Sequence, residues 1–134
     1  MGIGAQDLRG GARVSSLERA LVDCAARPRL AGGIDALAHG LASGDRLDLE
    51  RLRTYLTELH ARPAARRIGS VAAALGLEDI ARAMESFAPT GFDEIELEPQ
   101  ADRLTLEAST GYRDSKWRVR WGLLPDELAN SVWQ

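Results

Sequence analysis

Residues 15–33 read SSLERALVDCAARPRLAGG, and this stretch contains signals for both the start and the end of a helix. Ser15 and Glu18 form a Ser-x-x-Glu capping box, in which the Ser15 hydroxyl accepts from amides of the first turn. Pro28 ends the helix near Arg27, because the residue before a proline is pushed out of the helical region. Between these signals, apolar residues at spacings of three and four predict one buried face: Leu17, Ala20, Leu21, Cys24 and Ala25.

The same helical period continues to about residue 87 and predicts four more helices. Local signals mark their ends: Asp48 is the predicted N-cap of the third, Pro63 begins the fourth and Gly76 ends it. Each helix has an apolar face that we expect to be buried. These faces are Ile34, Leu37, Ala38 and Leu41, then Leu52, Tyr55, Leu56 and Leu59, then Ile68, Val71, Ala72 and Leu75, then Ile80, Ala83, Met84 and Phe87.

After Pro89 the apolar period changes from about 3.6 to 2, which is typical of strands with one buried face. The simplest pairing of three such strands is an antiparallel meander. A glutamate-bearing strand beside a Lys/Arg-bearing strand is favoured, since opposite charges across strands stabilise a sheet slightly. The alternating residues are Glu94, Ile95, Glu96, Leu97 and Glu98, then Leu104, Thr105 and Leu106, then Lys116, Trp117, Arg118, Val119, Arg120 and Trp121.

Pro125 begins a short final helix that carries Leu128, Val132 and Trp133. Because the helices precede the strands rather than alternate with them, the sequence predicts an α+β fold. That fold has about five N-terminal helices, a small three-stranded antiparallel sheet and a short C-terminal helix. A chain of 134 residues can bury a core of its own, so we expect a single domain. It comprises residues 13–134, and the Gly-rich residues 1–12 are expected to form a flexible lead-in.

The composition is that of an ordinary soluble globular protein, with 45% hydrophobic and 28% charged residues. The formal net charge of −3 weighs against a dedicated nucleic-acid-binding protein. Cys24 is the one cysteine, so an internal disulfide is excluded, which suits a reducing cytoplasm. No stretch reaches the ~18 uncharged apolar residues that a membrane span requires. We therefore expect a cytoplasmic protein without a membrane partner.

The sequence predicts no catalytic residue, no metal site and no cofactor. It contains no Gly-rich phosphate loop, and His39 and His60 lie on different predicted helices. Cys24 is interpreted as a small core residue and His60 as a favourable charge at a helix end. Residues 71–84 have the pattern of a helix-turn-helix, but acids start its second helix, where they would repel phosphates.

Two groups of cations are candidates for contacting a partner. Arg62, Arg66 and Arg67 lie at the predicted start of the fourth helix, where anions gather at free amides. Lys116, Arg118 and Arg120 share the polar face of the last predicted strand, whose opposite face places Trp117 and Trp121 under the helices. Either group could contact nucleic acid or an acidic protein surface. The alternative for both groups is an ordinary solvated surface.

Several motifs together resemble the C-terminal domain of AbiEi-type antitoxins, and the resemblance covers about residues 13–124. The helix SLERALVD at residues 16–23, followed by RPRLAGG at 27–33, resembles that domain's opening. LDLERL at 47–52 resembles its third-helix start, and ARRIG at 65–69 resembles its Arg-Arg-Leu-Gly helix. Residues 112–121 resemble its closing Trp-bearing strand.

The resemblance implies the bacterial antitoxin half of a type IV toxin–antitoxin pair, linked to abortive infection and phage defence. Family members carry an N-terminal winged helix that binds the operon's promoter, and their C-terminal domain carries the antitoxin activity. This chain departs from the pattern, because it has no room for the winged helix and has Ala20 where the family commonly has Thr. We therefore expect a non-enzymatic domain that counters a cognate nucleotidyltransferase-like toxin, through the toxin or its substrate. The alternatives are an accessory DNA-binding or transcription-regulator module with weak DNA contact, and a small enzyme.

Overall fold

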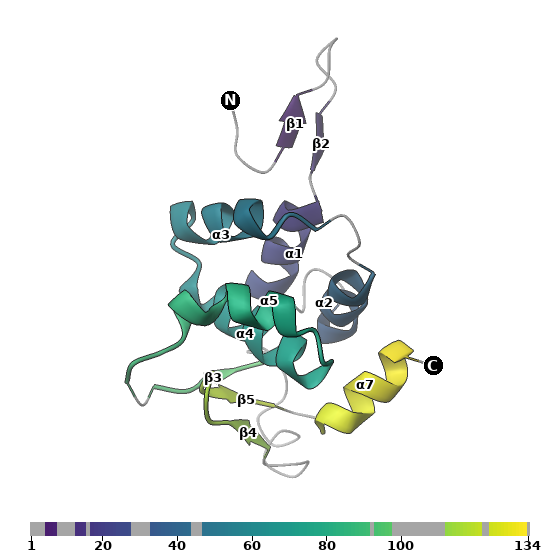
Figure 1. Ribbon diagram of the computed structural model, residues 1–134, viewed down its shortest axis with the longest axis vertical. Coiled ribbons are helices and arrows are strands. Elements are labelled where there is room, and N and C mark those ends of the chain that lie inside the picture. Colours follow the sequence, from purple (N-terminus) through teal and green to yellow (C-terminus); the bar gives the residue numbers. More distant parts are fainter. Residues whose placement is uncertain are drawn as a thin grey trace.

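A computed structural model of the chain shows a helical body with a small sheet at one end (Figure 1). It describes residues 5–7, 13–15, 17–27, 33–43, 47–91, 93–97, 112–121 and 124–133. The order of elements agrees with the predicted α+β class. The elements are β1 (Ala5–Asp7), β2 (Arg13–Ser15), α1 (Leu17–Ala26), α2 (Gly33–Ala42), α3 (Leu49–Glu58), α4 (Arg62–Ala74), α5 (Glu78–Ala83), the 3-10 turn η1 (Glu85–Phe87), β3 (Ile95–Glu96), β4 (Arg113–Asp114), β5 (Val119–Arg120) and α7 (Pro125–Trp133).

The N-terminal strands β1 and β2 form an antiparallel hairpin that stands off from the helical body (Figure 1). The sequence analysis predicted no strand here. Ser15 ends β2, where it pairs with Ala5, and α1 begins at Leu17. The helix thus starts one residue later than predicted, and the Ser15 side chain, on which the predicted capping box depends, lies outside what the structure describes. The Glu18 carboxylate is buried and accepts a hydrogen bond of 2.7 Å from the backbone N–H of Asp48.

The buried face of α1 is rotated by about one residue from the predicted one. Its buried residues are Glu18, Leu21, Val22 and Ala25, whereas Leu17 and Ala20 are exposed and Cys24 is half-buried. The bond between Glu18 and the start of α3 explains the rotation, because it directs a charged side chain into the interior. Apolar spacing alone predicts that such a side chain faces solvent.

Helices α2, α3 and α4 bury the faces that their sequences predict, with Leu59 as the exception. Asp48 is the N-cap of α3, and its Oδ1 accepts from the Arg51 N–H at 3.1 Å. Leu59 lies beyond the end of α3 and is 41% exposed. Gly76 ends the turn after α4 with a φ of +78°, a conformation that glycine adopts without a Cβ clash.

Helix α4 is central to the core. It packs against α1, α2, α3, α5, α7 and β5. Trp117 and Trp121 are each 1% exposed and belong to the same core cluster as Ile68 and Val71 of α4. The prediction that both tryptophans lie under the helices is therefore confirmed, although Trp117 lies in the turn before β5 rather than in the strand.

The sheet has the order β3-β5-β4 and is mixed, so the predicted antiparallel meander is wrong. The tight turn between β4 and β5 makes that pair antiparallel, whereas β3 runs parallel to β5 with Ile95 beside Val119. Parallel pairing needs a long connection, and residues 98–111 between β3 and β4 supply that length. The strand predicted around Leu104 and Leu106 lies outside the described residues.

The chain ends with α7, which packs against α2 and α4 through the fully buried Leu128. Val132 is half-buried, and Trp133 is 53% exposed. Among the described helices, none combines the length and the apolar character that crossing a membrane requires.

Candidate functional site

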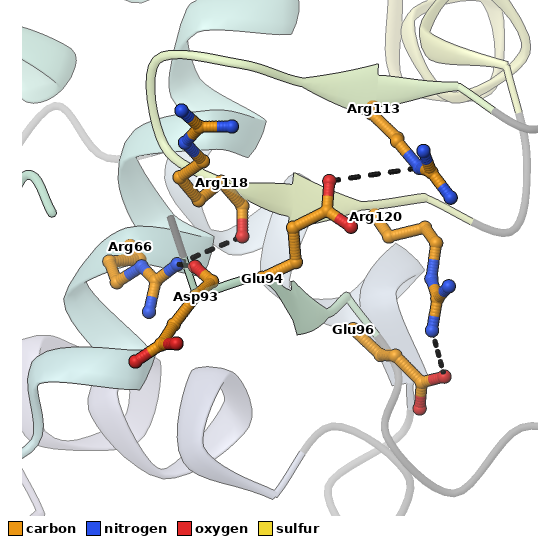
Figure 2. A network of polar contacts seen from close by, with 7 residues as sticks. All are labelled: Arg66, Asp93, Glu94, Glu96, Arg113, Arg118 and Arg120. Carbon is orange, nitrogen blue, oxygen red and sulfur yellow. Dashed lines mark hydrogen bonds and ion pairs between the residues drawn. The ribbon is translucent and has the colours of Figure 1, made fainter. Parts of the chain in front are cut away.

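Arg66 lies on the buried side of α4 and binds backbone carbonyls (Figure 2). Its Nε donates to the carbonyl of Trp117 at 3.0 Å, and its Nη2 donates to those of Asp93 at 2.7 Å and Arg118 at 2.9 Å. The residue is only 7% exposed. The hydrogen bonds of Arg66 thus connect α4 to the segment before β3 and to the turn before β5.

Arg67, the next residue of α4, also binds backbone carbonyls of other segments. Its Nε donates to the carbonyl of Glu96 and its Nη1 to that of Ala25, both at 2.9 Å. Burial lowers the pKa of the Arg67 guanidinium, and the charge of Arg66 lowers it further, yet arginine stays protonated in proteins. Arg67 therefore joins α1, α4 and β3 through one planar group.

The cluster predicted at the start of α4 does not form a shared surface. Arg62 is exposed, and its guanidinium carbon lies 5.9 Å from the centroid of the Phe87 ring. Arg66 and Arg67 are buried, so the expectation that all three face solvent or a partner is wrong for these two. Their charge is stabilised by carbonyl oxygens from distant segments, which the spacing within the helix does not reveal.

The second predicted group is also divided by the fold. Arg120 Nη2 forms a 3.1 Å ion pair with Glu96 on the neighbouring strand, which confirms the predicted pairing of acidic and basic strands. Lys116 lies in the β4–β5 turn, pairs with Glu85 and sits over the Trp117 ring. Arg113 adds a 3.7 Å pair with Glu94 (Figure 2).

Arg118 is the last residue of the β4–β5 turn. Its φ is +54°, a left-handed backbone conformation that is unusual for a residue other than glycine. Its carbonyl accepts from both Arg66 Nη2 and the Ile95 N–H. Its side chain is half-buried and points away from the Arg66 guanidinium in Figure 2. The Arg66 side chain and the Ile95 N–H thus hold the strained turn against α4 and β3 through the Arg118 carbonyl.

A buried polar chain that the sequence analysis missed lies beside these arginines. The Ser70 hydroxyl of α4 accepts from Trp121 Nε1 at 2.8 Å and donates to Asp114 Oδ2 at 2.7 Å. The other oxygen of Asp114 accepts from the backbone N–H groups of Lys116 and Trp117. Alternation along the strand could place Trp121 in the core, but only the packed helix supplies its hydrogen-bond partner.

A groove of about 600 Å³ opens on a different part of the molecule, between the end of α2, the segment entering α3 and the start of α5. Leu41 is buried at its base, and Leu47, Leu49 and Leu77 are half-buried. Its remaining lining residues are small, aliphatic or charged: Ala42, Gly76, Glu78, Asp79, Ile80 and Arg82.

The sequence does not predict this groove, because its walls come from three separate segments. In the sequence, Glu78 and Asp79 stand out only as acids at a position where DNA-reading residues would lie. In the structure they are exposed, and Asp79 lies 3.7 Å from Arg82. The groove therefore combines aliphatic side chains with a rim of mixed charge, formed by Glu78, Asp79 and Arg82.

The residues first examined for metal binding or catalysis do not come together. His39 and His60 are both exposed, on or next to different helices, and Cys24 is half-buried on α1. Within the part of the chain that the structure describes, no group of three or more His, Cys, Asp and Glu side chains could hold a metal ion.

No family model, no curated protein and no solved structure matches the chain.

Proposed function

We propose that this chain is an antitoxin-type interaction domain that counters a cognate nucleotidyltransferase-like toxin. The observation that carries the proposal is the groove between α2, α3 and α5, a concave surface that exposes both aliphatic and charged side chains. Surfaces of this kind bind other proteins or small ligands. The resemblance to AbiEi-type antitoxins supplies the biological context.

The motifs that carry the resemblance support the proposal by contacting one another. Arg67, from the ARRIG motif, binds the carbonyl of Ala25 in α1, and Arg66 binds that of Trp117 in the closing segment. Glu18, from the opening motif, accepts from Asp48 in the LDLERL motif. These residues form the scaffold, which is where a family that shares a fold is expected to retain a common pattern.

Most of the candidate cations are engaged within the chain, and this favours a protein partner over nucleic acid. Arg66 and Arg67 are bound to carbonyls, and Lys116, Arg113 and Arg120 are paired with glutamates. Phosphate binding would have to compete with each of these contacts, whereas the groove is open to a partner without breaking any of them.

Co-expression tests the proposal. The chain is produced in cells together with the nucleotidyltransferase-like toxin encoded beside it, and growth is compared with cells that carry the toxin alone. Restored growth is expected. Gly69→Leu serves as the unfolded control, since a side chain at residue 69 meets the Trp117 ring. Continued growth arrest in the presence of soluble, folded chain would overturn the proposal, and a salt-sensitive shift of promoter DNA would then favour the DNA-binding alternative.

A further inference from the structure

We infer that α7 is a strap that opens as a separate unit while the other described helices and the β3-β5-β4 sheet stay folded. This opening is independent of the proposed function, because it depends only on how α7 is held against α2 and α4. In the open state, the parts of α2 and α4 on which α7 packs become accessible. The chain thereby gains a second conformation with an apolar face that the first conformation covers.

Apolar packing alone holds α7 to the rest of the described chain. The Glu127 carboxylate stays within its own helix start, where it accepts from the Leu124 N–H at 2.8 Å. No hydrogen bond or ion pair joins α7 to another described element. The sheet is held differently, because Arg66, Arg67 and Ser70 of α4 bind it through side-chain hydrogen bonds.

The apolar packing of α7 depends mainly on one side chain. Of the nine residues of α7, only Leu128 is buried, whereas Ala129 and Val132 are half-buried. Helix α2 also makes no side-chain hydrogen bond to another described element, but it buries four apolar side chains. Because the buried apolar area opposes separation, α7 is held less firmly than α2. Elements with few buried apolar contacts open at a lower free energy than the whole fold.

The opening unit begins after Trp121, at the end of β5. The Trp121 side chain is 1% exposed, and its Nε1 donates to the Ser70 hydroxyl at 2.8 Å. Its backbone N–H donates to the carbonyl of Tyr112 at 3.0 Å. These bonds hold the chain in place up to Trp121 when α7 separates. Residues 122 and 123 lie outside the described part, and the strap is defined without them.

A separated α7 is too short to remain a stable helix. Pro125 at its start and the bond from Leu124 to Glu127 both favour the first turn. However, the nine residues of α7 fall short of the ~12–15 that an isolated helix needs in water. Opening therefore breaks the helical hydrogen bonds of α7, and amide hydrogen exchange can detect it.

Hydrogen exchange of the whole chain, followed by mass spectrometry of its peptides, tests the strap. We expect the amides of residues 129–133 to exchange about 100-fold or more faster than those of residues 66–74 in α4. Low urea should change the α7 rate only slightly, because a local opening exposes little surface. Equal rates in α7 and α4, with the same dependence on urea, would overturn the inference.

Leu52→Ala separates a local opening from unfolding of the whole chain. Leu52 is buried in α3, so its loss destabilises the closed and the open state equally, relative to the unfolded chain. We expect the α4 amides to exchange about 30-fold or more faster, and the α7 amides to keep their rate. An equal acceleration in α7 would mean that α7 opens only when everything unfolds, against the inference. If Leu52→Ala does not fold, the urea dependence of the unmodified chain makes the same distinction.

Leu128→Ala tests which side chain keeps the strap closed. Removing this buried side chain should make the α7 amides exchange about tenfold or more faster. The matched control is Ser131→Ala, which is exposed on the same helix and should change the rate by less than about threefold. Equal exchange of the two variants would show that the packing of Leu128 does not hold α7, and the strap would be refuted.

Discussion

Gly69 of α4 lies directly against the indole ring of Trp117. A methyl group at residue 69 would lie 2.5 Å from Cη2 and Cζ2 of that ring, closer than any real carbon contact. Trp117 is 1% exposed and its carbonyl accepts from Arg66, so the ring cannot move outward without loosening the turn before β5. The close approach of helix and tryptophan thus depends on the missing Cβ.

Gly69→Ala is expected to lower the free energy of unfolding. Overpacking a core costs about 1–3 kcal/mol, and the higher helix propensity of alanine returns up to about 1 kcal/mol. A net loss of about 1–2 kcal/mol in urea unfolding is the expected result. Gly91→Ala is the matched control, since nothing lies within 4 Å of a Cβ at residue 91. Equal stability of the two variants would contradict this close packing of Gly69 against Trp117.

Arg67→Lys is expected to destabilise the fold although it keeps the positive charge. The guanidinium reaches the carbonyls of Ala25 and Glu96 with two different nitrogens, and a lysine ammonium is a point donor that cannot span both. Leaving a buried carbonyl unpaired should cost about 2–3 kcal/mol. Arg51→Lys, at an exposed position, should change stability by less than about 0.5 kcal/mol. Thermal unfolding of both variants measures the difference. An Arg67→Lys variant as stable as the unmodified chain would show that the two hydrogen bonds of Arg67 do not stabilise the fold.

Ser70→Ala should cost more than an ordinary serine substitution. It removes the hydroxyl that accepts from the fully buried Trp121 Nε1 and donates to Oδ2 of the half-buried Asp114. We expect a loss of about 2–3 kcal/mol, because unsatisfied buried groups carry the full desolvation penalty. Ser43→Ala provides the comparison, since the Ser43 hydroxyl is exposed. Denaturant unfolding measures the difference in the free energy of unfolding, provided that its dependence on denaturant concentration is unchanged. A near-neutral Ser70→Ala would show that the hydrogen bonds of Ser70 contribute little to stability.

Cys24 should react slowly with alkylating reagents in the folded protein. Burial raises the pKa of its thiol, and the negative charge of Asp23 raises it further, so less thiolate is present at a given pH. The folded state then retains a proton that the unfolded state loses, and stability falls as pH rises past the ordinary thiol pKa. Labelling of Cys24 by iodoacetamide, followed by mass spectrometry, is expected to be slower in the folded protein than in the protein unfolded in urea. Asp23→Asn should speed it, and unchanged labelling on unfolding would argue against this environment.

The sequence by itself determined the helices and most of their buried faces. Ile34, Leu37, Ala38 and Leu41 repeat at helical spacing, and all four are buried in α2 as that spacing predicts. Asp48 is the N-cap of α3 because capping involves only the amides of the next turn. Such signals act over a few residues and can therefore be read directly from the chain.

Only the tertiary structure decided the direction of β3 and the position of the groove. Alternation of Ile95 and Leu97 has the same period in parallel and antiparallel strands, so it could not exclude pairing parallel to β5. The groove needs the end of α2, the entry to α3 and the α4–α5 turn in one place. No local pattern specifies which distant segments converge.

The roles of Arg66 and Arg67 show the physical reason for this division. Their charge favours water, and within the helix alone both would be assigned to the surface. Their acceptors belong to segments far along the chain, such as the carbonyl of Trp117 for Arg66, so folding alone brings donor and acceptor together. Local hydrogen bonding and apolar spacing can be predicted from the sequence. The burial of a charge depends on partners that only the folded chain assembles.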